Sequence, residues 1–232
     1  MTAENTAYNI NKAEAYEKNT RISVPSYDSL FAMVQSYFRM QFDAKAASLL
    51  VVGAGGGNEL SAWGPTNPDW SFTGVDPSEE MLSFAKHKAA ELEMENRVQL
   101  IHGTVEDLPQ TSSKFDAASC ILVLHFIDDR EEKLKLLRTI KNQLKSGAPF
   151  VLVSAYGDRN DPEFQARMNV WKSFWIEAGR ERSDVDERAK TFDRLSLLPE
   201  KQIEELLAQA GFTGITRFYS TVLMAGWLCH AE

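Results

Sequence analysis

The clearest chemical signal in this chain is the glycine-rich segment 53–57 (Gly-Ala-Gly-Gly-Gly), which directly follows the apolar run 49–52. Glycine permits positive φ and, lacking a Cβ, lets a ligand approach the backbone. A helix that begins after such a loop presents free N–H groups and a positive dipole end, which favours a nucleoside-type ligand. About twenty residues later, Asp76 ends a second apolar run, where its carboxylate can accept both hydroxyl protons of a ribose. The alternative is that Asp76 only caps the following helix.

The glycine spacing alone fits several cofactors. The pattern is G-x-G-x-G from Gly53 to Gly57, whereas a dinucleotide fingerprint needs glycine where Asn58 stands. No lysine follows, as a phosphate-binding P-loop would require. On the spacing alone, a glycine turn without a ligand therefore stays open.

His125, just after the fourth predicted strand, is the best-placed candidate for a general base. The alternative is a histidine bonded to the backbone at a helix entrance. The remaining histidines and both cysteines show no metal-ligand spacing (His87, His102, His230, Cys120 and Cys229). We therefore expect no metal site and two reduced core cysteines.

Composition narrows the class of partner. The 232 residues include 33 acidic and 25 basic side chains, for a formal charge of −8, so the surface should repel nucleic-acid phosphates. No apolar run approaches the roughly 20 residues of a membrane span, and the polar residues 1–11 lack the apolar part of a signal peptide. The sequence predicts a soluble, cytoplasmic protein without a membrane or nucleic-acid partner.

Apolar runs of strand length alternate with helix signals through much of the chain. The predicted strands are 47–52, 70–75, 97–101, 115–122 and 149–154, with helices at 57–64, 78–92 and 131–144. This alternation is typical of a parallel, doubly wound α/β sheet with helices on both faces. Ligands then bind beyond the carboxyl ends of the strands. A helix at 200–210 and strands at 215–219 and 222–229 complete a mostly parallel, seven-stranded sheet.

The segments around this core predict how it is covered. We expect a short helix at 11–20, an extended approach at 21–27 because the residue before proline avoids the helical region, and an amphipathic helix ending near Phe42. The strand and helix alternation breaks at 156–198, which predicts a small helical cap insertion. The prediction is one domain, with N-terminal helices at 1–44, a cofactor-binding core at 45–155, the cap at 156–198 and a closing helix and two strands at 199–232.

An aromatic stripe runs along the first cap helix, where Phe164, Met168, Trp171 and Trp175 recur at helical spacing. Such stripes more often pack a lid or a homodimer contact than line a pocket. Trp171 and Trp175 nevertheless stand as candidates for an apolar or aromatic acceptor pocket.

Polar candidates for the pocket come from other segments. Tyr27 and Tyr156, the latter directly after the fifth predicted strand, are the polar aromatics expected to enter it. The charged segment 177–190 is predicted to be a solvated face, and Arg188 within it is a candidate contact for an acidic substrate.

Five segments resemble the class I S-adenosylmethionine-dependent methyltransferases. They are V-V-G-A-G-G-G-N-E-L, G-V-D-P-S-E-E-M-L, H-G-T-V-E-D-L-P, F-D-A-A-S-C-I-L-V-L-H-F-I and L-K-S-G-A-P-F-V-L-V-S. They cover residues 49–154, and their order and spacing make the match specific as a set. The resemblance implies a Rossmann-like fold with S-adenosylmethionine as cofactor.

The resemblance also implies a contact for each part of that cofactor. The implied residues are Gly53, Ala54 and Gly55 at the methionine part, with Gly57 in the same loop, Asp76 at the ribose, Pro77, Met81, Thr104 and Val105 at the adenine, and Cys120 and Ile121 at the sulfonium. One position departs from the family, which often has an aspartate where this chain has Thr104.

A narrower resemblance reaches both ends of the chain. Residues 21–27 and the closing segment from 210 onward look like the carboxy-S-adenosylmethionine synthase of tRNA wobble-uridine modification. The residues that would hold its modified cofactor are Tyr27 and Arg188. However, an asparagine and an aspartate of that enzyme correspond here to Ile121 and Thr104, which argues for a relative that simply transfers methyl groups.

Methyl transfer needs little acid–base chemistry, because the sulfonium is already a strong electrophile and the protein mainly aligns a nucleophile in line with the methyl carbon. The sequence thus predicts an S-adenosylmethionine-dependent methyltransferase acting on a small-molecule acceptor. The alternatives are a carboxy-S-adenosylmethionine synthase-like enzyme and a non-catalytic cofactor-binding protein.

Overall fold

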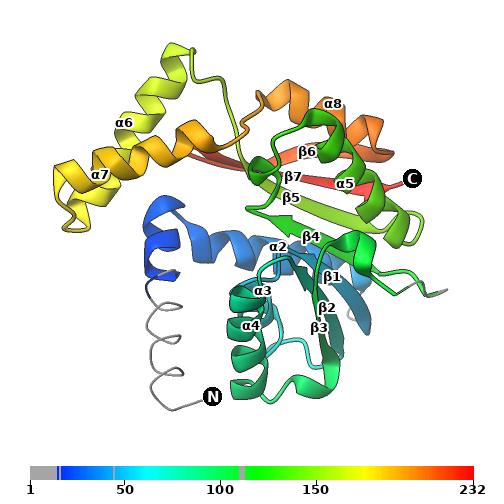
Figure 1. Cartoon of the computed structure of the whole chain (residues 1–232). Coiled ribbons are helices and arrows are strands. Elements are labelled where there is room, and N and C mark those ends of the chain that lie inside the picture. The colour runs from blue at the N-terminus through cyan, green and yellow to red at the C-terminus, as the bar shows by residue number, and fades with distance from the viewer. Residues whose placement is uncertain (1–14, 16, 44, 110–112) are drawn as a thin grey trace.

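The computed structural model describes residues 15, 17–43, 45–109 and 113–232. Within them, seven strands form one sheet in the order β3-β2-β1-β4-β5-β7-β6 (Figure 1). The strands are β1 (Ala47–Val52), β2 (Trp70–Asp76), β3 (Val98–His102), β4 (Ala117–Ile121), β5 (Pro149–Ala155), β6 (Phe212–Thr221) and β7 (Met224–Ala231). β1 to β5 pair in parallel, whereas β7 pairs antiparallel with β5 and β6. The predicted mostly parallel, seven-stranded sheet is confirmed.

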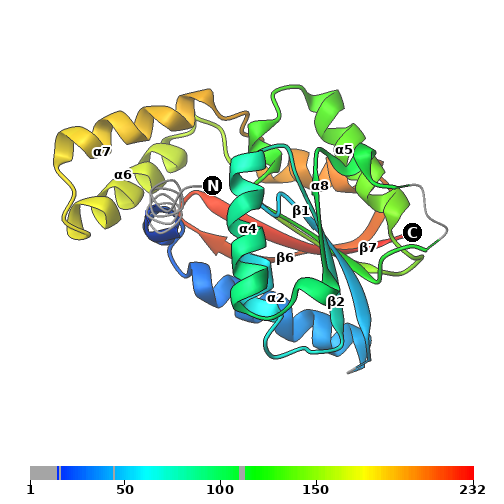
Figure 2. The same cartoon turned by 60° about the horizontal axis from the view of Figure 1, so that its bottom comes forward.

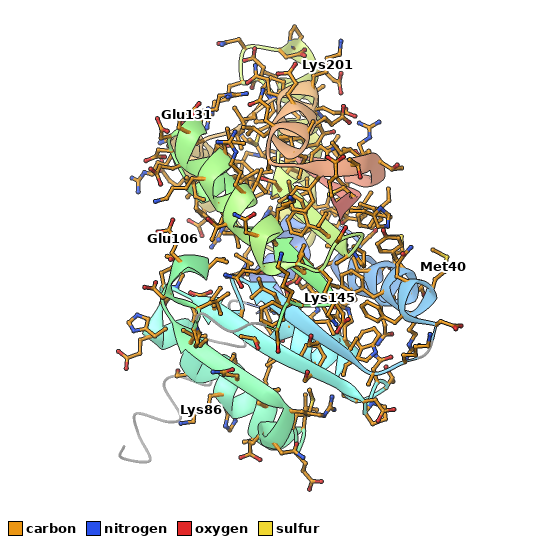
Figure 3. The ribbon with its side chains drawn as sticks, turned by 90° about the vertical axis from the view of Figure 1, so that its right-hand side faces the viewer. Met40, Lys86, Glu106, Glu131, Lys145 and Lys201 are labelled. Carbon is orange, nitrogen blue, oxygen red and sulfur yellow. The ribbon has the colours of Figure 1, made fainter. Side chains whose placement is uncertain are left out.

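Helices cover both faces of this sheet, because neighbouring residues of a strand point to opposite sides. In β1, Leu49 and Val51 pack into one core cluster with α2 (Tyr27–Phe42), α3 (Asn58–Trp63) and α4 (Glu79–Glu91). Leu50 and Val52 pack into the other cluster, with α5 (Arg130–Gln143) and α8 (Glu200–Gln209). Figure 3 shows Glu131 of α5 and Lys201 of α8 pointing away from the sheet, as amphipathic covering helices require.

The helices begin where side chains can cap them. The Ser78 hydroxyl accepts from the Met81 N–H at 3.2 Å before α4, and the Asp129 carboxylate accepts from the Glu131 and Glu132 N–H groups before α5. These bonds satisfy N–H groups that the first helical turn leaves unpaired. Local capping explains why the start of each of these helices lies within a residue of the predicted one.

The approach to α2 differs from the prediction. Residues 17–23 are helical, and the Val24 N–H still donates to the Thr20 carbonyl at 2.8 Å, so the segment expected to be extended from residue 21 is not. Proline restricts only its immediate neighbour, and the helix ends at Val24 for that reason. Ser26 then turns the chain with φ of 66° into α2. The expected helix at 11–20 lies partly outside the described residues.

The cap at 156–198 consists of α6 (Pro162–Glu177), α7 (Arg182–Ala189) and the short helix η4 (Lys190–Arg194). Figures 1 and 2 show α6 and α7 side by side, projecting beyond one end of the sheet. The aromatic stripe of α6 is buried within the cap, and the rings of Trp171 and Phe192 meet edge to face at 5.1 Å. Lid packing therefore accounts for the stripe.

None of the helices in the described ranges combines the length and the apolar character needed to cross a membrane.

Candidate active site

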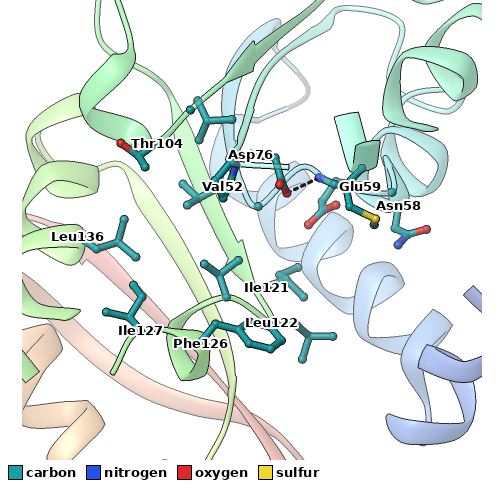
Figure 4. A pocket seen from close by; sticks show the side chains of 18 of the residues that line it. Val52, Asn58, Glu59, Asp76, Thr104, Ile121, Leu122, Phe126, Ile127 and Leu136 are labelled. Carbon is teal, nitrogen blue, oxygen red and sulfur yellow. Dashed lines mark hydrogen bonds between the residues drawn. The ribbon is translucent and has the colours of Figure 1, made fainter. Parts of the chain in front are cut away.

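A cavity of about 490 Å³ opens at the carboxyl ends of β1, β2 and β4 (Figure 4). β1 and β4 are neighbours at the centre of the sheet, and the chain runs outward from them in opposite directions, towards β3 on one side and β5 on the other. Doubly wound sheets bind ligands at this switch point, where consecutive loops diverge and leave a crevice. The volume lies within the usual range for small-molecule sites.

The glycine loop forms one wall of the cavity. The N–H groups of Gly53 and Ala54 both donate to the Val75 carbonyl, at 2.9 and 3.0 Å, which holds the loop against the end of β2. Gly53 has φ of 76°, and a Cβ there would collide with the Val123 side chain. A Cβ on Gly55 would lie 3.1 Å from Asp76 Oδ2. The absence of side chains at these positions creates part of the cavity.

Asp76 ends β2 with both carboxylate oxygens positioned by backbone groups. Its Oδ2 accepts from the Gly55 N–H at 2.9 Å and its Oδ1 accepts from the Ser78 N–H at 2.8 Å. A carboxylate has about four lone-pair positions, so each oxygen can accept a further hydrogen bond from a ligand. The side chain that caps α4 is Ser78, not Asp76. Capping of this helix therefore does not explain why Asp76 lines the cavity.

Apolar side chains form the opposite wall. They come from β1, β4, the segment after β4 and α5: Val52, Ile121, Leu122, Val123, Phe126, Ile127 and Leu136. Leu122 adopts φ of 61°, a strained value for a branched residue, and its N–H donates to the Val153 carbonyl at 2.8 Å. Phe126 is 68% exposed, so an aromatic ring lies at the rim of the cavity.

The structure brings together eight of the residues expected to bind the cofactor. Those lining the cavity are Tyr27, Gly53, Gly55, Asp76, Pro77, Met81, Thr104 and Ile121. Thr104 is also the cap of a short helix, η2 (Val105–Asp107), and its N–H and hydroxyl both donate to Asp107 Oδ2, at 2.8 and 3.1 Å.

Four other expected cofactor residues do not line the cavity. Ala54 and Val105 are buried, and Cys120 points to the face of β4 opposite Ile121, where burial raises the pKa of its thiol to about 12. Gly57 lies against α4, and a Cβ there would be 2.9 Å from the Ala85 Cα. Its glycine serves close packing between helices.

Sequence reasoning missed two polar residues of the wall, Asn58 and Glu59, which open α3. Asn58 Nδ2 donates to the Tyr27 hydroxyl and its Oδ1 accepts from Lys88 Nζ, both at 3.0 Å. Glu59 is 4% exposed, and burial raises the pKa of its carboxyl to about 7. Their position directly after the glycine loop was the available signal, because the first helical turn continues the wall of the loop.

His125 does not reach the cavity wall. Its ring is 4% exposed, and Nδ1 accepts from the Ala155 N–H at 3.0 Å and lies 3.2 Å from the Ser154 hydroxyl. Burial lowers the pKa of this imidazole to about 3. This geometry matches the alternative, a histidine bonded to the backbone, and the role of general base stays a prediction.

The four expected substrate residues lie outside the cavity wall. The Tyr156 hydroxyl is 3.3 Å from Ser220 Oγ. Within the cap, Trp171 Nε1 donates to the Ser23 carbonyl at 3.0 Å, and the Arg188 guanidinium lies 4.3 Å above the Trp175 ring. A substrate role for these four side chains stays a prediction, since none of them reaches the cavity wall.

Among the side chains the structure describes, no group of three or more histidine, cysteine, aspartate or glutamate residues could hold a metal ion.

The chain is similar in sequence to known methyltransferases. A family model described as a methyltransferase domain matches residues 50–150. The demethylmenaquinone methyltransferase of Listeria welshimeri is 26% identical over 212 residues, which cover 82% of this chain and 84% of that protein. The carboxy-S-adenosyl-L-methionine synthase of Trichodesmium erythraeum is 24% identical over 216 residues, covering 90% of this chain and 82% of that protein.

Solved structures show the same fold. Magnesium protoporphyrin IX methyltransferase from Synechocystis PCC 6803 with bound S-adenosylmethionine superposes with a TM-score of 0.63 at 14% identity, covering 93% of this chain and 83% of that chain. The chain spans 55% of the length of other, longer methyltransferase structures with this fold. The domain match and these relatives support the class I S-adenosylmethionine-dependent methyltransferase family for this chain, and the solved structures show that it has their Rossmann-like fold.

Proposed function

We propose that the protein transfers the methyl group of S-adenosylmethionine to an apolar small molecule by in-line displacement. The observation that carries the proposal is the division of one cavity into a polar end, with the glycine loop and Asp76, and an apolar end formed by the segment after β4 and by α5. A cavity with this division can hold a nucleoside at one end and an uncharged acceptor at the other.

The polar end suits the adenosine part of the cofactor. The two oxygens of Asp76 are oriented by Gly55 and Ser78 and can accept the ribose hydroxyls. Pro77 and Met81 follow in the same wall and offer apolar contacts for the adenine ring. The glycine loop lets the methionine part approach the backbone, because Gly53 and Gly55 carry no side chain.

The apolar end suits the alignment of a methyl acceptor. When bound, S-adenosylmethionine supplies an electrophilic methyl group on a positively charged sulfur. Ile121, Leu122 and Val123 would exclude water there, and Phe126 at the rim would contact the acceptor as it enters. Positioning and exclusion of water contribute most of the rate enhancement in such a reaction. The relatives named as methyltransferases of demethylmenaquinone and of magnesium protoporphyrin IX support a small-molecule acceptor.

Synthesis of a carboxylated cofactor remains the competing proposal because of the relative from Trichodesmium erythraeum. The position of Arg188 supports methyl transfer instead. Arg188 is an exposed residue of α7 whose guanidinium lies over the Trp175 ring. It does not line the cavity wall, where a cation would be needed to hold an added carboxylate.

Calorimetric titration with S-adenosylmethionine tests the polar end of the site. We expect Asp76→Ala to weaken binding by about 100-fold, because two hydrogen bonds to a charged group are lost. Asp184→Ala is the matched control, since Asp184 is exposed on α7 in the cap. Unchanged affinity in a folded Asp76→Ala variant would refute the ribose assignment.

A panel of apolar and polar acceptors tests the other end. We expect the protein to methylate only the apolar acceptors and to release S-adenosylhomocysteine. Cofactor binding without turnover of any acceptor would instead favour a non-catalytic cofactor-binding protein. Mass spectrometry of the ligand released from purified protein separates a methylated from a carboxylated cofactor.

A further inference from the structure

Glu59 is a buried acid in the wall of the cofactor cavity. It lies in the first turn of α3, directly after the glycine loop, and only 4% of its surface is exposed. Figure 4 shows its side chain at the same end of the cavity as Asp76. A carboxylate removed from water at such a place needs a compensating cation or a proton.

No cation among the described residues forms an ion pair with Glu59. Lys88 of α4 is the nearby positive charge, but its Nζ is held by Glu17 and by Asn58 Oδ1. Its own backbone N–H acts on the Glu59 carboxyl in the same direction as Lys88, favouring the charged form. Within the part of the chain that the structure describes, Lys88 therefore acts on this acid only through its charge and not as an ion-pair partner.

The other groups that face Glu59 do not supply the missing charge. Asp76 of β2 is an acid that repels it, and Cys120 of β4 is a buried thiol. Tyr27 of α2 lines the same wall, and its hydroxyl accepts a hydrogen bond from Asn58. Burial first, and then the charge of Asp76, raise the pKa of Glu59 to about 7, against the opposing effects of its own N–H and of Lys88.

We propose that Glu59 carries a proton in the empty cavity and gives it up to solvent when the cofactor binds, so that the carboxylate pairs with the cationic methionine end. The step breaks the carboxylic O–H bond, passes the proton to buffer and forms an ion pair with the ammonium or the sulfonium, without any change in oxidation state. This inference rests on the proposed function, since it takes S-adenosylmethionine as the ligand. It makes cofactor affinity dependent on pH through one side chain of the wall.

Proton release during binding is the direct test, and it needs no variant. Titration calorimetry of the wild-type chain in phosphate and in imidazole, two buffers with different enthalpies of ionisation, counts the protons exchanged. We expect release of about 0.9 proton at pH 6. At pH 8 Glu59 releases only about 0.1 proton while the ligand's amino group takes up about 0.5 to form the ammonium, so the net exchange changes sign and binding is about fivefold tighter than at pH 6. The ligand's own amino group, with a reference pKa near 8, stays protonated at pH 6.

The Glu59→Gln variant assigns the proton to this side chain. We expect it to lose the proton release and to bind at least tenfold more weakly than wild type at pH 8. Glu205→Gln, at an exposed position of α8, should behave like wild type. Glu59→Asp, which restores the acid, should recover part of the proton release.

The two cofactor forms identify the cation. S-adenosylhomocysteine keeps the ammonium but lacks the sulfonium, so an equal loss of affinity for both forms in Glu59→Gln assigns the ammonium, and a larger loss for S-adenosylmethionine assigns the sulfonium. Binding by wild type without proton release, or with the same release in Glu59→Gln, overturns the inference while leaving the proposed function intact. Failure of wild type to bind either form overturns both.

Discussion

At the scale of single residues, two buried titratable groups make the stability of the empty protein respond to pH in opposite directions. The pKa of Glu59 is raised to about 7, so the folded state holds an extra proton and stability falls as pH rises from 4.5 through 7. The pKa of His125 is lowered to about 3, so its contribution is complete above pH 6.5 and is lost as pH falls towards 3. Between pH 4.5 and 6.5 the two effects oppose each other.

A variant separates the two effects. We expect the free energy of unfolding of Glu59→Gln, relative to wild type, to increase by about 3 kcal/mol between pH 4.5 and pH 8, because the variant has no acid to ionise in the cavity. Urea unfolding of the empty protein across this pH range measures the difference. A difference that stays constant with pH would mean that Glu59 ionises as an ordinary acid in the empty cavity, and Glu205→Gln should show such a constant difference.

At the scale of elements, Lys133 of α5 connects the segment after β4 to Ser196, near the end of the cap segment. Its side chain is almost completely buried, and Nζ donates to the carbonyls of Leu124, Ile127 and Ser196. The Ser196 N–H also donates to the His125 carbonyl at 2.9 Å. These bonds hold the backbone of the apolar cavity wall without placing a charge inside the cavity.

The contact between α3 and α4 depends on Gly57. Gly57→Ala would place a Cβ 2.9 Å from the Ala85 Cα at φ of 68°, and we expect a loss of about 2–3 kcal/mol in unfolding free energy. Gly147→Ala is the matched control, because Gly147 has φ of 75° with open space around it and should lose only about 1 kcal/mol. Thermal and urea unfolding measure both values. Equal losses would show that backbone strain, and not helix packing, determines the effect.

At the scale of the whole molecule, α6 of the cap contacts the helical residues 17–23 that precede α2; both lie on the same side of the molecule (Figure 1). Trp171 Nε1 of α6 donates to the Ser23 carbonyl at 3.0 Å, and the Tyr219 hydroxyl of β6 donates to the Pro25 carbonyl at 2.8 Å. Tyr27, a residue of the cavity wall, follows directly. The cap therefore supports the cavity indirectly, through the turn that starts α2.

Trp171→Phe tests this support. Loss of one hydrogen bond costs about 1 kcal/mol, so we expect amide hydrogen exchange in residues 17–26 to become about fivefold faster while exchange in α6 stays close to wild type. Trp175→Phe is the control, because the described residues provide no hydrogen-bond partner for Trp175 Nε1. Unchanged exchange in 17–26 would show that the cap and the N-terminal segment are independent.

The sequence alone predicted the α/β architecture because its signals are local. Apolar runs flanked by capping residues and glycines define β1 to β5 and α3 to α5 within a few residues, and the alternation of strands and helices leaves few topologies. Gly53, Gly55 and Asp76 could be predicted to lie together for the same reason, since loops after parallel strands meet at one edge of the sheet, and the three residues line one cavity.

Only the tertiary structure decided which side chains face the cavity. Neighbouring residues of β4 point to opposite faces of the sheet, so Ile121 lies on the cavity wall and Cys120 lies in the core cluster on the other face. The sequence does not show which of these two apolar residues faces the cavity. Folding brings Leu136 of α5 to the same wall from far along the chain and takes His125 out of reach. Burial of Glu59 likewise depends on elements that meet around it, because the pKa of a side chain is determined by its neighbours in space and not by those in sequence.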